Sequence, residues 1–188
     1  MSVNFGLHIE SPTVVSSYLN GSLVDRYNHA AQSGSYIGMA VANDDGGNCQ
    51  PPIDRLEVRD APGGSLLLAD DFASLASWTA GWTVSGGAWS INPAGFAYQA
   101  GEGATIYRAD VADGAYIEAQ GVTFDASVTD GWLMLMLEMD TPAANPTLGA
   151  LDGYRVLLRA PGAPNAGGVE IVNGLPLSGW SVGMVRIA

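Results

Sequence analysis

The stretch that decides the fold is Thr-Val-Val-Ser-Ser-Tyr-Leu-Asn-Gly-Ser-Leu-Val, residues 13–24. Residues 13–19 are rich in β-branched and aromatic types, which favour extended strands. Asn20 and Gly21 tolerate the positive φ angles of a two-residue hairpin turn, and the apolar pattern resumes after them. The stretch therefore predicts two antiparallel strands joined by a tight turn.

The same signals recur along the whole chain. Short apolar runs alternate with turn residues, among 25 glycines and 10 prolines, as in all-β proteins. No long window has the apolar spacing of an amphipathic helix, and only residues 71–78 suggest a short helical turn. We expect a hairpin whose turn is residues 85–87. The other strands are expected at residues 36–41, 53–58, 66–68, 82–84, 88–91, 96–99, 104–108, 115–124, 132–139, 155–159, 169–172 and 182–187.

Apolar and charged residues alternate in the segment that follows Ile53. Leu56 and Val58 are separated by Glu57, with arginines on either side of the three. Alternation of this kind buries one face of a strand and wets the other. We therefore expect Glu57 to face water.

Length and composition favour one folded domain. A chain of 188 residues with 47% apolar and 14% charged residues can bury a sizeable core and is not disordered. We expect a single β-sandwich domain over residues 1–188, in which residues 61–64 (Ala-Pro-Gly-Gly) are a linker or turn between residues 1–60 and residues 65–188.

The charge of the chain excludes several classes of partner. The formal net charge is −12, and all 7 basic residues are arginine. A surface of this kind repels phosphate backbones and anionic lipids, so we expect no nucleic-acid partner. The single Cys49 excludes an intramolecular disulfide framework. The longest apolar run, residues 132–137, is too short to span a bilayer, and the first residues do not have the pattern of a secretory signal.

Several short motifs together resemble one known family. Asp-Asp-Phe at residues 70–72, a tryptophan-containing segment at residues 82–91 and Gly-Tyr-Arg-Val at residues 153–156 are similar to the opening half of concanavalin A-like or laminin G-like jelly rolls. The Asn-Gly turn, Ser-Gly-x-x-x-Gly at residues 33–38 and Asp-x-Leu-x-Val at residues 54–58 resemble the closing half. The resemblance implies an antiparallel β-sandwich.

The two halves occur in reverse order. Joined end to start, residues 180–187 would lead into residues 7–9, as the middle strands of the family do. Two explanations are open. One is a circularly permuted single jelly roll, and the other is half-domains completed by neighbouring copies of the chain.

The resemblance also implies a candidate metal site. In many lectin-like sandwiches a structural Ca²⁺ joins the opening acidic segment to the final strand. The corresponding residues are Asp70, Asp71 and Asp54, whose carboxylates are ligands that Ca²⁺ prefers. The alternative is that these aspartates cap turns. No other cofactor is expected.

Candidate residues for carbohydrate binding and for catalysis are few. Trp78 and Trp132 each lie next to a turn, where a flat ring can stack on a sugar, although tryptophan in a sandwich is often part of the core. Glu138 and Asp140 resemble the Glu-x-Asp-x-Glu strand of some β-glucan hydrolases, but Pro142 replaces the third carboxylate. We therefore assign no catalytic residue and expect no enzyme activity.

We expect a non-enzymatic structural or binding module on the exterior of a larger assembly. A phage virion protein is the leading interpretation, either a capsid decoration or a component of a tail spike or fibre, made in the host cytoplasm. Its partners would be other copies of itself, virion shell or fibre proteins, or a glycan. The alternative is a lectin-like carbohydrate-binding module. A third interpretation, a degenerate glycoside hydrolase, needs two carboxylates facing each other across a cleft at ~5–10 Å.

Overall fold

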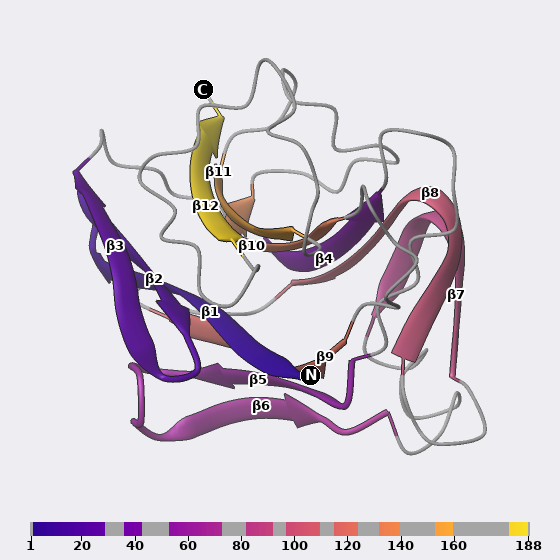
Figure 1. Cartoon of the computed structure of the whole chain (residues 1–188), viewed down its shortest axis with the longest axis horizontal. Helices are drawn as coiled ribbons and strands as arrows, with labels where there is room; N and C mark the ends of the chain where they lie inside the picture. The colour runs from indigo at the N-terminus through magenta and orange to yellow at the C-terminus, as the bar shows by residue number, and fades with distance from the viewer. Residues whose placement is uncertain are drawn as a thin grey trace.

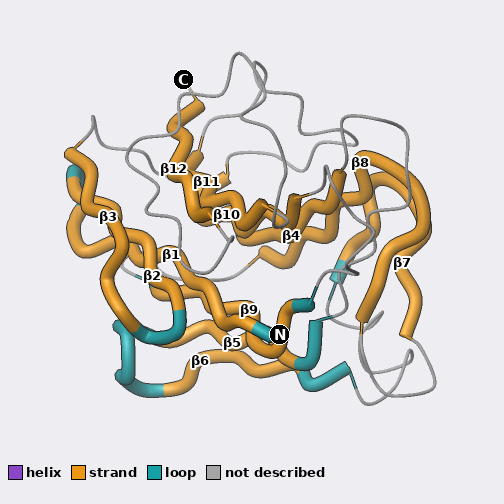
Figure 2. The backbone as a smooth tube through the Cα atoms, in the orientation of Figure 1, coloured by secondary structure: helices purple, strands orange, loops and turns teal. Residues whose placement is uncertain are grey.

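The computed structural model describes residues 2–28, 36–42, 53–72, 82–91, 97–109, 115–123, 132–139, 153–159 and 181–187. Most of these residues lie in strands (Figures 1 and 2). None of the described residues belongs to a helix that could cross a membrane. The strands are β1 (Val3–Ser11), β2 (Val14–Leu19), β3 (Ser22–Asn28), β4 (Tyr36–Ala42), β5 (Arg55–Arg59), β6 (Leu66–Asp70), β7 (Thr83–Ile91), β8 (Ala97–Ala109), β9 (Tyr116–Val122), β10 (Trp132–Met139), β11 (Gly153–Arg159) and β12 (Ser181–Ile187).

The strands form two antiparallel sheets that pack face to face. The first sheet has six strands in the order β3-β2-β1-β9-β5-β6, and the second has six in the order β12-β11-β10-β4-β8-β7. Every described strand pair is antiparallel. The chain is therefore an all-β sandwich, as the sequence predicts.

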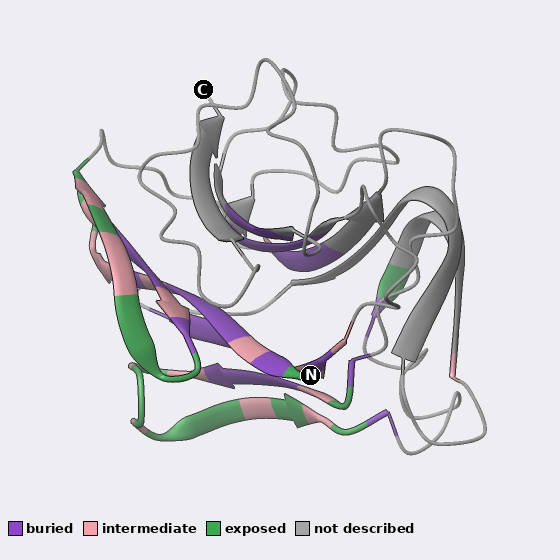
Figure 3. Cartoon of the chain, viewed as in Figure 1, coloured by how far each residue is buried: buried purple, intermediate pink, exposed green. Residues whose placement is uncertain are grey.

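One hydrophobic core joins the two sheets (Figure 3). Alternate residues of β1, β2, β4, β5, β9, β10 and β11 point into it, because side chains of a strand alternate between its faces. The first sheet contributes apolar residues from β1, β2, β5 and β9, and the second contributes them from β4, β10 and β11. The largest fully buried side chains are Phe5, Phe72, Leu7, Leu19, Ile37, Met39, Ile53 and Leu56.

The turn at Asn20 and Gly21 forms as its sequence predicts. Both residues have positive φ angles, 50° and 75°, between the antiparallel strands β2 and β3. Glycine and asparagine adopt these angles at low cost.

Residues 61–64 form a turn. They connect β5 to β6, which pair with each other in the first sheet. The amide of Asp60 donates to the carbonyl of Ser65 at 3.1 Å, and the amide of Gly64 donates to the carbonyl of Ala61 at 2.9 Å. Gly63 supplies a φ of 72°. The turn therefore lies inside a hairpin of one sheet.

The hairpin predicted with its turn at residues 85–87 is wrong. β7 runs through these residues as one strand and pairs along its length with β8. The register shifts on either side of Gly86, so the glycines are accommodated as irregularities of the ladder. β8 likewise runs through residues 100–103, which separate two predicted strands. A continuous partner strand has overridden the local turn preference.

The other strand predictions agree with the structure wherever it describes the residues. The helical turn expected within residues 71–78 and the strand expected at residues 169–172 fall largely or wholly outside the described residues. β1 extends well beyond residues 7–9 and lies at the centre of the first sheet. Its apolar residues alternate with polar residues and glycine, so it has a core face and an outer face.

Candidate functional site

The outer face of the first sheet carries two rows of polar and aromatic side chains that cross neighbouring strands. One row runs from Glu57 on β5 to Glu118 on β9, Gly6 on β1 and Tyr18 on β2, which are successive cross-strand partners. The next row holds the cross-strand partners Arg59, Tyr116, His8 and Ser16. These residues alternate along their strands with core residues, so they lie on the face turned away from the core.

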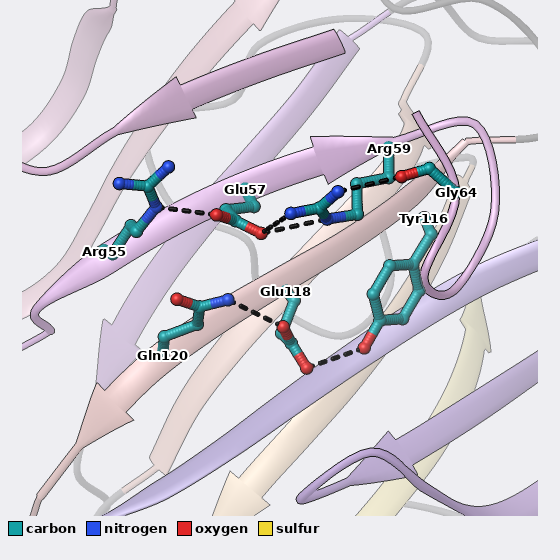
Figure 4. A network of polar contacts seen from close by, with 7 residues as sticks. All are labelled: Arg55, Glu57, Arg59, Gly64, Tyr116, Glu118 and Gln120. Atoms are coloured by element: carbon teal, nitrogen blue, oxygen red, sulfur yellow. Dashed lines mark hydrogen bonds and ion pairs between the residues drawn. The ribbon is translucent and has the colours of Figure 1, made fainter. Parts of the chain in front are cut away.

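Glu57 is fixed between two arginines of its own strand (Figure 4). The Nε of Arg55 donates to Oε1 at 2.7 Å, and the Nη2 and Nε of Arg59 donate to Oε2 at 2.7 and 3.0 Å. Arg59 also donates to the carbonyl of Gly64 at 2.8 Å, which holds it against the β5–β6 turn. The carboxylate is therefore bound at both of its oxygens.

The expectation that Glu57 faces water is wrong, because its side chain is only 7% exposed. It does lie on the outer face, but residues two positions away on a strand share that face. The long side chains of Arg55 and Arg59 therefore fold over it from both sides (Figure 4). Burial by itself raises the pKa of Glu57, but hydrogen bonds and charge from Arg59 and Arg55 outweigh it, and the pKa is lowered. Glu57 is thus an anion at neutral pH.

Glu118, directly opposite Glu57, is held by uncharged donors (Figure 4). The hydroxyl of Tyr116 donates to its Oε1 at 2.8 Å, and the Nε2 of Gln120 donates to its Oε2 at 2.9 Å. Burial, with a further contribution from Glu118, raises the pKa of Tyr116 well above its usual value. The hydroxyl therefore remains protonated and donates.

Tyr116 is fixed by aromatic neighbours and by the absence of a side chain at Gly6. Its ring lies 5.5 Å from that of Tyr18 and 6.1 Å from that of His8, with nearly perpendicular planes. A Cβ on Gly6 would come within 2.6 Å of the Cε2 and Cζ atoms of Tyr116. The ring therefore occupies space that only glycine leaves open. Desolvation lowers the pKa of His8 despite the charge of Glu10, so His8 is uncharged at neutral pH.

A hollow of about 590 Å³ lies over these residues. Its sides include Gly21 of the β2–β3 turn and Pro62 and Gly63 of the β5–β6 turn. The strands contribute Tyr18, Glu57, Arg59, Tyr116, Glu118 and Gln120. With the adjacent Arg55, the two glutamates and two arginines balance in formal charge, although the whole chain is strongly acidic. The hollow therefore offers hydrogen-bond donors, acceptors and an aromatic surface without net charge.

Asp70, one of the three expected calcium ligands, serves as a local hydrogen-bond acceptor in this structure. Its Oδ1 accepts from the amide of Phe72 at 2.9 Å, and its Oδ2 accepts from the indole Nε1 of Trp82 at 3.1 Å. Phe72 is buried with a φ of 53°, and Asp70 holds the chain in this conformation as it leaves β6. This is the turn-capping role that the sequence left open as an alternative.

Asp54 and Asp71 are exposed and do not join Asp70 in a cluster of ligands. The amide of Asp54 donates to the carbonyl of Gln120 at 3.0 Å, and its carboxylate lies beside Gly121. Within the described ranges, no group of three or more His, Cys, Asp or Glu side chains could hold a metal ion. A structural Ca²⁺ at these aspartates stays a prediction.

The side chains of the two tryptophans proposed to bind carbohydrate lie outside the part of the chain that the structure describes. Trp132 is the first residue of β10 in the second sheet, where its backbone lies between Ala42 and Arg159. Trp78 lies outside the described residues, as does Asp140. Sugar stacking by Trp78 and Trp132 therefore also stays a prediction.

Sequence reasoning did not identify the residues of the hollow. The available signal was two polar triplets at every second residue, Arg-x-Glu-x-Arg at residues 55–59 and Tyr-x-Glu-x-Gln at residues 116–120. Each triplet predicts a shared face on its own strand. Their juxtaposition follows only from the pairing of β5 with β9.

Comparison with known proteins gives no family. No family model matches the chain, and no curated protein is recognisably similar to it.

Proposed function

We propose that the chain is a non-enzymatic binding module on the exterior of a larger assembly, and that its ligand occupies the hollow over β5 and β9. The observation that carries this proposal is the pair of locked carboxylates, Glu57 and Glu118, in a charge-balanced setting. Both carboxylates, and the Arg59 and Tyr116 side chains that bind them, are held by hydrogen bonds before any ligand arrives. Preorganisation of this kind lowers the entropy cost of binding.

The chemistry of the hollow favours a neutral ligand rich in hydroxyl groups, such as a carbohydrate. A carboxylate oxygen has two lone pairs and a guanidinium has five N–H donors, so Glu118 and Arg59 can bind further partners. Tyr18, which is half-buried, adds a ring beside these groups. A sugar offers hydroxyls that both donate and accept, together with an apolar ring face that packs on aromatic rings.

The deprotonated state of Glu57 supports a binding role over a role in hydrolysis. Glycoside hydrolysis by two carboxylates needs one of them to hold a proton as the general acid. The arginines beside Glu57 lower its pKa and occupy both of its oxygens. Glu57 is thus poorly suited to that role, although it lies directly opposite Glu118.

For the fold family and the assembly, we propose a circularly permuted concanavalin A-like jelly roll that forms part of a phage virion. The β5–β6 hairpin supports the permutation. β5 corresponds to the closing strand of that family and β6 to its opening strand, and a permuted chain would join these two neighbours by a turn. A formal charge of −12 favours solubility of a module exposed to water. The module would serve as a capsid decoration or as part of a tail spike or fibre.

Binding of the purified chain to an array of glycans tests the ligand. We expect at least one glycan to bind. Glu118→Gln and Tyr18→Ala should each weaken binding about tenfold, the effect of losing one hydrogen bond to a charged group or one packing surface. Thr83→Ala, on the exposed start of β7 in the other sheet, should bind as the wild type does. The carbohydrate proposal fails if no glycan binds, or if the two variants bind as well as the wild type.

Immunogold labelling tests the assembly. Antibodies against the chain should label the outside of particles released by the producing cells. Labelling confined to the cell interior would contradict an exterior role.

A further inference from the structure

The β2–β3 turn carries a dipeptide that can modify itself chemically. Asn20 and Gly21 are both exposed, and a Cβ placed on Gly21 would meet nothing within 4 Å. Because Gly21 has no side chain, its amide nitrogen is the least hindered nucleophile that can follow an asparagine. In the part of the chain that the structure describes, Asn20 is the only asparagine followed by glycine. The turn is therefore a candidate site of deamidation.

Deamidation of Asn20 needs no reaction partner other than water. The amide nitrogen of Gly21 gives up its proton and bonds to Cγ of Asn20, while the bond from Cγ to Nδ2 breaks and ammonia leaves with that proton. Water then opens the resulting succinimide ring at one of its two carbonyl carbons. One opening gives aspartate, and the other gives isoaspartate, in which the main chain runs through Cβ and Cγ.

The folded turn keeps the two reacting atoms apart. Leu19 pairs with Ser22, and the positive φ angles of the two residues between them are those of a type I′ turn. The ψ angle of the first of these residues is then about +30°, which places the nitrogen of Gly21 nearly trans to Cβ of Asn20 about the Cα–C bond. Attack requires the nitrogen to come within about 3–3.5 Å of Cγ. Asn20 therefore cannot react until its ψ angle changes.

Asn4 on β1 resists that change by holding Asn20 at two points. The backbone amide of Asn4 donates to Oδ1 of Asn20 at 2.9 Å, and the backbone amide of Asn20 donates to the carbonyl of Asn4 at 2.7 Å. The first bond fixes the side chain that must be attacked, and the second fixes the main chain that must rotate. Each bond favours the closed turn about fivefold, so together they favour it about 25-fold.

We propose that Asn20 is a deamidation site that reacts only while the β2–β3 turn is detached from Asn4, and that its isoaspartate product prevents the turn from re-forming. An isoaspartate adds one main-chain carbon to a turn whose length sets the register between β2 and β3. Gly21 also borders the hollow. The modification therefore displaces one wall of the hollow irreversibly, a consequence that rests on the proposed function.

Peptide mapping of the full chain by chromatography and mass spectrometry tests the proposal, because it separates asparagine, aspartate and isoaspartate peptides. At mildly alkaline pH, the conversion of Asn20 should be about 25-fold slower in the folded protein than in guanidinium chloride. Asn173, which also precedes a glycine, is the internal reference for the rate of the unfolded dipeptide. Equal rates for Asn20 in the folded and unfolded protein overturn the proposal. An Asn20 that stays unmodified in denaturant while Asn173 reacts also overturns it.

Hydrogen exchange identifies the opening through which Asn20 reacts. The amide of Asn20 is released from the carbonyl of Asn4 in the same event, so its exchange should be slowed by about the same factor as deamidation. Clearly different factors would show that the two reactions depend on different motions, which overturns the proposal.

A matched pair of variants tests the contact with Asn4. Asn4→Pro removes the amide that donates to Oδ1 of Asn20 and should speed deamidation of the folded protein about fivefold. Asn4→Ala loses the same side chain but keeps that amide, so it should react at the wild-type rate. Equal rates in the two folded variants overturn the role of the contact. Circular dichroism checks folding, and the exchange comparison in the wild type decides if Asn4→Pro does not fold.

The modified protein separates this inference from the proposed function. In the purified isoaspartate fraction, the amide of Asn4 should exchange faster than in Asn20→Asp, which keeps a normal main chain and an acceptor oxygen for that amide. Equal exchange in the two overturns the proposal, whether or not any glycan binds. Loss of glycan binding by the isoaspartate fraction, with binding retained by Asn20→Asp, would extend the damage to the hollow. Equal glycan binding by the two would contradict the effect on the hollow and leave the proposed function standing. If no glycan binds the unmodified chain, the proposed function fails and the rates still decide the deamidation.

Discussion

Gly6→Ala is the substitution for which the structure makes its sharpest prediction. A methyl group at this position would overlap the ring of Tyr116, approaching Cε2 and Cζ to 2.6 Å and the hydroxyl more closely still. Contacts this short are not tolerated, so the ring must move. Tyr116 is only 3% exposed and packs on His8 and Tyr18, which leaves it little room.

The expected loss follows from three contributions. Forcing an extra methyl into a packed site costs about 1–3 kcal/mol. Displacing the tyrosine hydroxyl from Glu118 removes a hydrogen bond to a charged group, worth about 1.5–3 kcal/mol. Replacing glycine within a strand returns about 0.5–1 kcal/mol of backbone entropy. Because the ring can move part of the way without losing every contact, we expect Gly6→Ala to lower the free energy of unfolding by about 2–4 kcal/mol.

Urea unfolding followed by tryptophan fluorescence measures this loss, and a double-mutant cycle assigns it. In a Tyr116→Ala background the obstructing ring is gone, so Gly6→Ala should be neutral or stabilise the protein by about 0.5–1 kcal/mol. The reasoning is refuted if Gly6→Ala stabilises the wild type. It is equally refuted if its cost is the same in both backgrounds, because the methyl group would then not be meeting Tyr116.

Two further predictions concern single carboxylates. Because the pKa of Glu57 is lowered in the folded state from its usual 4.5, its stabilising effect is present above that pH and is lost as the pH falls through the lower, folded value. Glu57→Gln should therefore lower the free energy of unfolding by about 1–2 kcal/mol at pH 7, a loss kept small by the partial exposure of both arginines. The difference in stability between wild type and variant should disappear in acid. A difference that stays constant with pH would contradict the ionic role of Glu57. Asp70→Ala removes the acceptor of the buried Trp82 indole, so it should lower the free energy of unfolding by about 1–3 kcal/mol and shift the tryptophan emission. Asp70→Asn keeps an acceptor oxygen and should lower it by less than about 1 kcal/mol. Equal losses of stability for the two variants in thermal unfolding would argue against this contact.

Local patterns in the sequence were sufficient for the fold class and for most strands. Period-two alternation and the turn at Asn20 and Gly21 depend only on residues that are close together in the chain. The backbone preferences of these residues are local, so they can be read without knowing which distant segments pack together. Residues 85–87 mark the limit of this approach. Their glycines favour a turn in isolation, but pairing with β8 before and after Gly86 kept the strand continuous, with irregularities at the glycines.

Only the tertiary structure decided the candidate site. Backbone ladders accept any neighbouring strand, so the sequence of β5 does not say that β9 lies beside it or that Glu57 faces Glu118. Burial of Glu57 likewise depends on how its flanking arginines fold over the finished sheet. The order of the strands is also a property of the assembled sheets, because it is fixed by the packing of the whole core and not by any one segment.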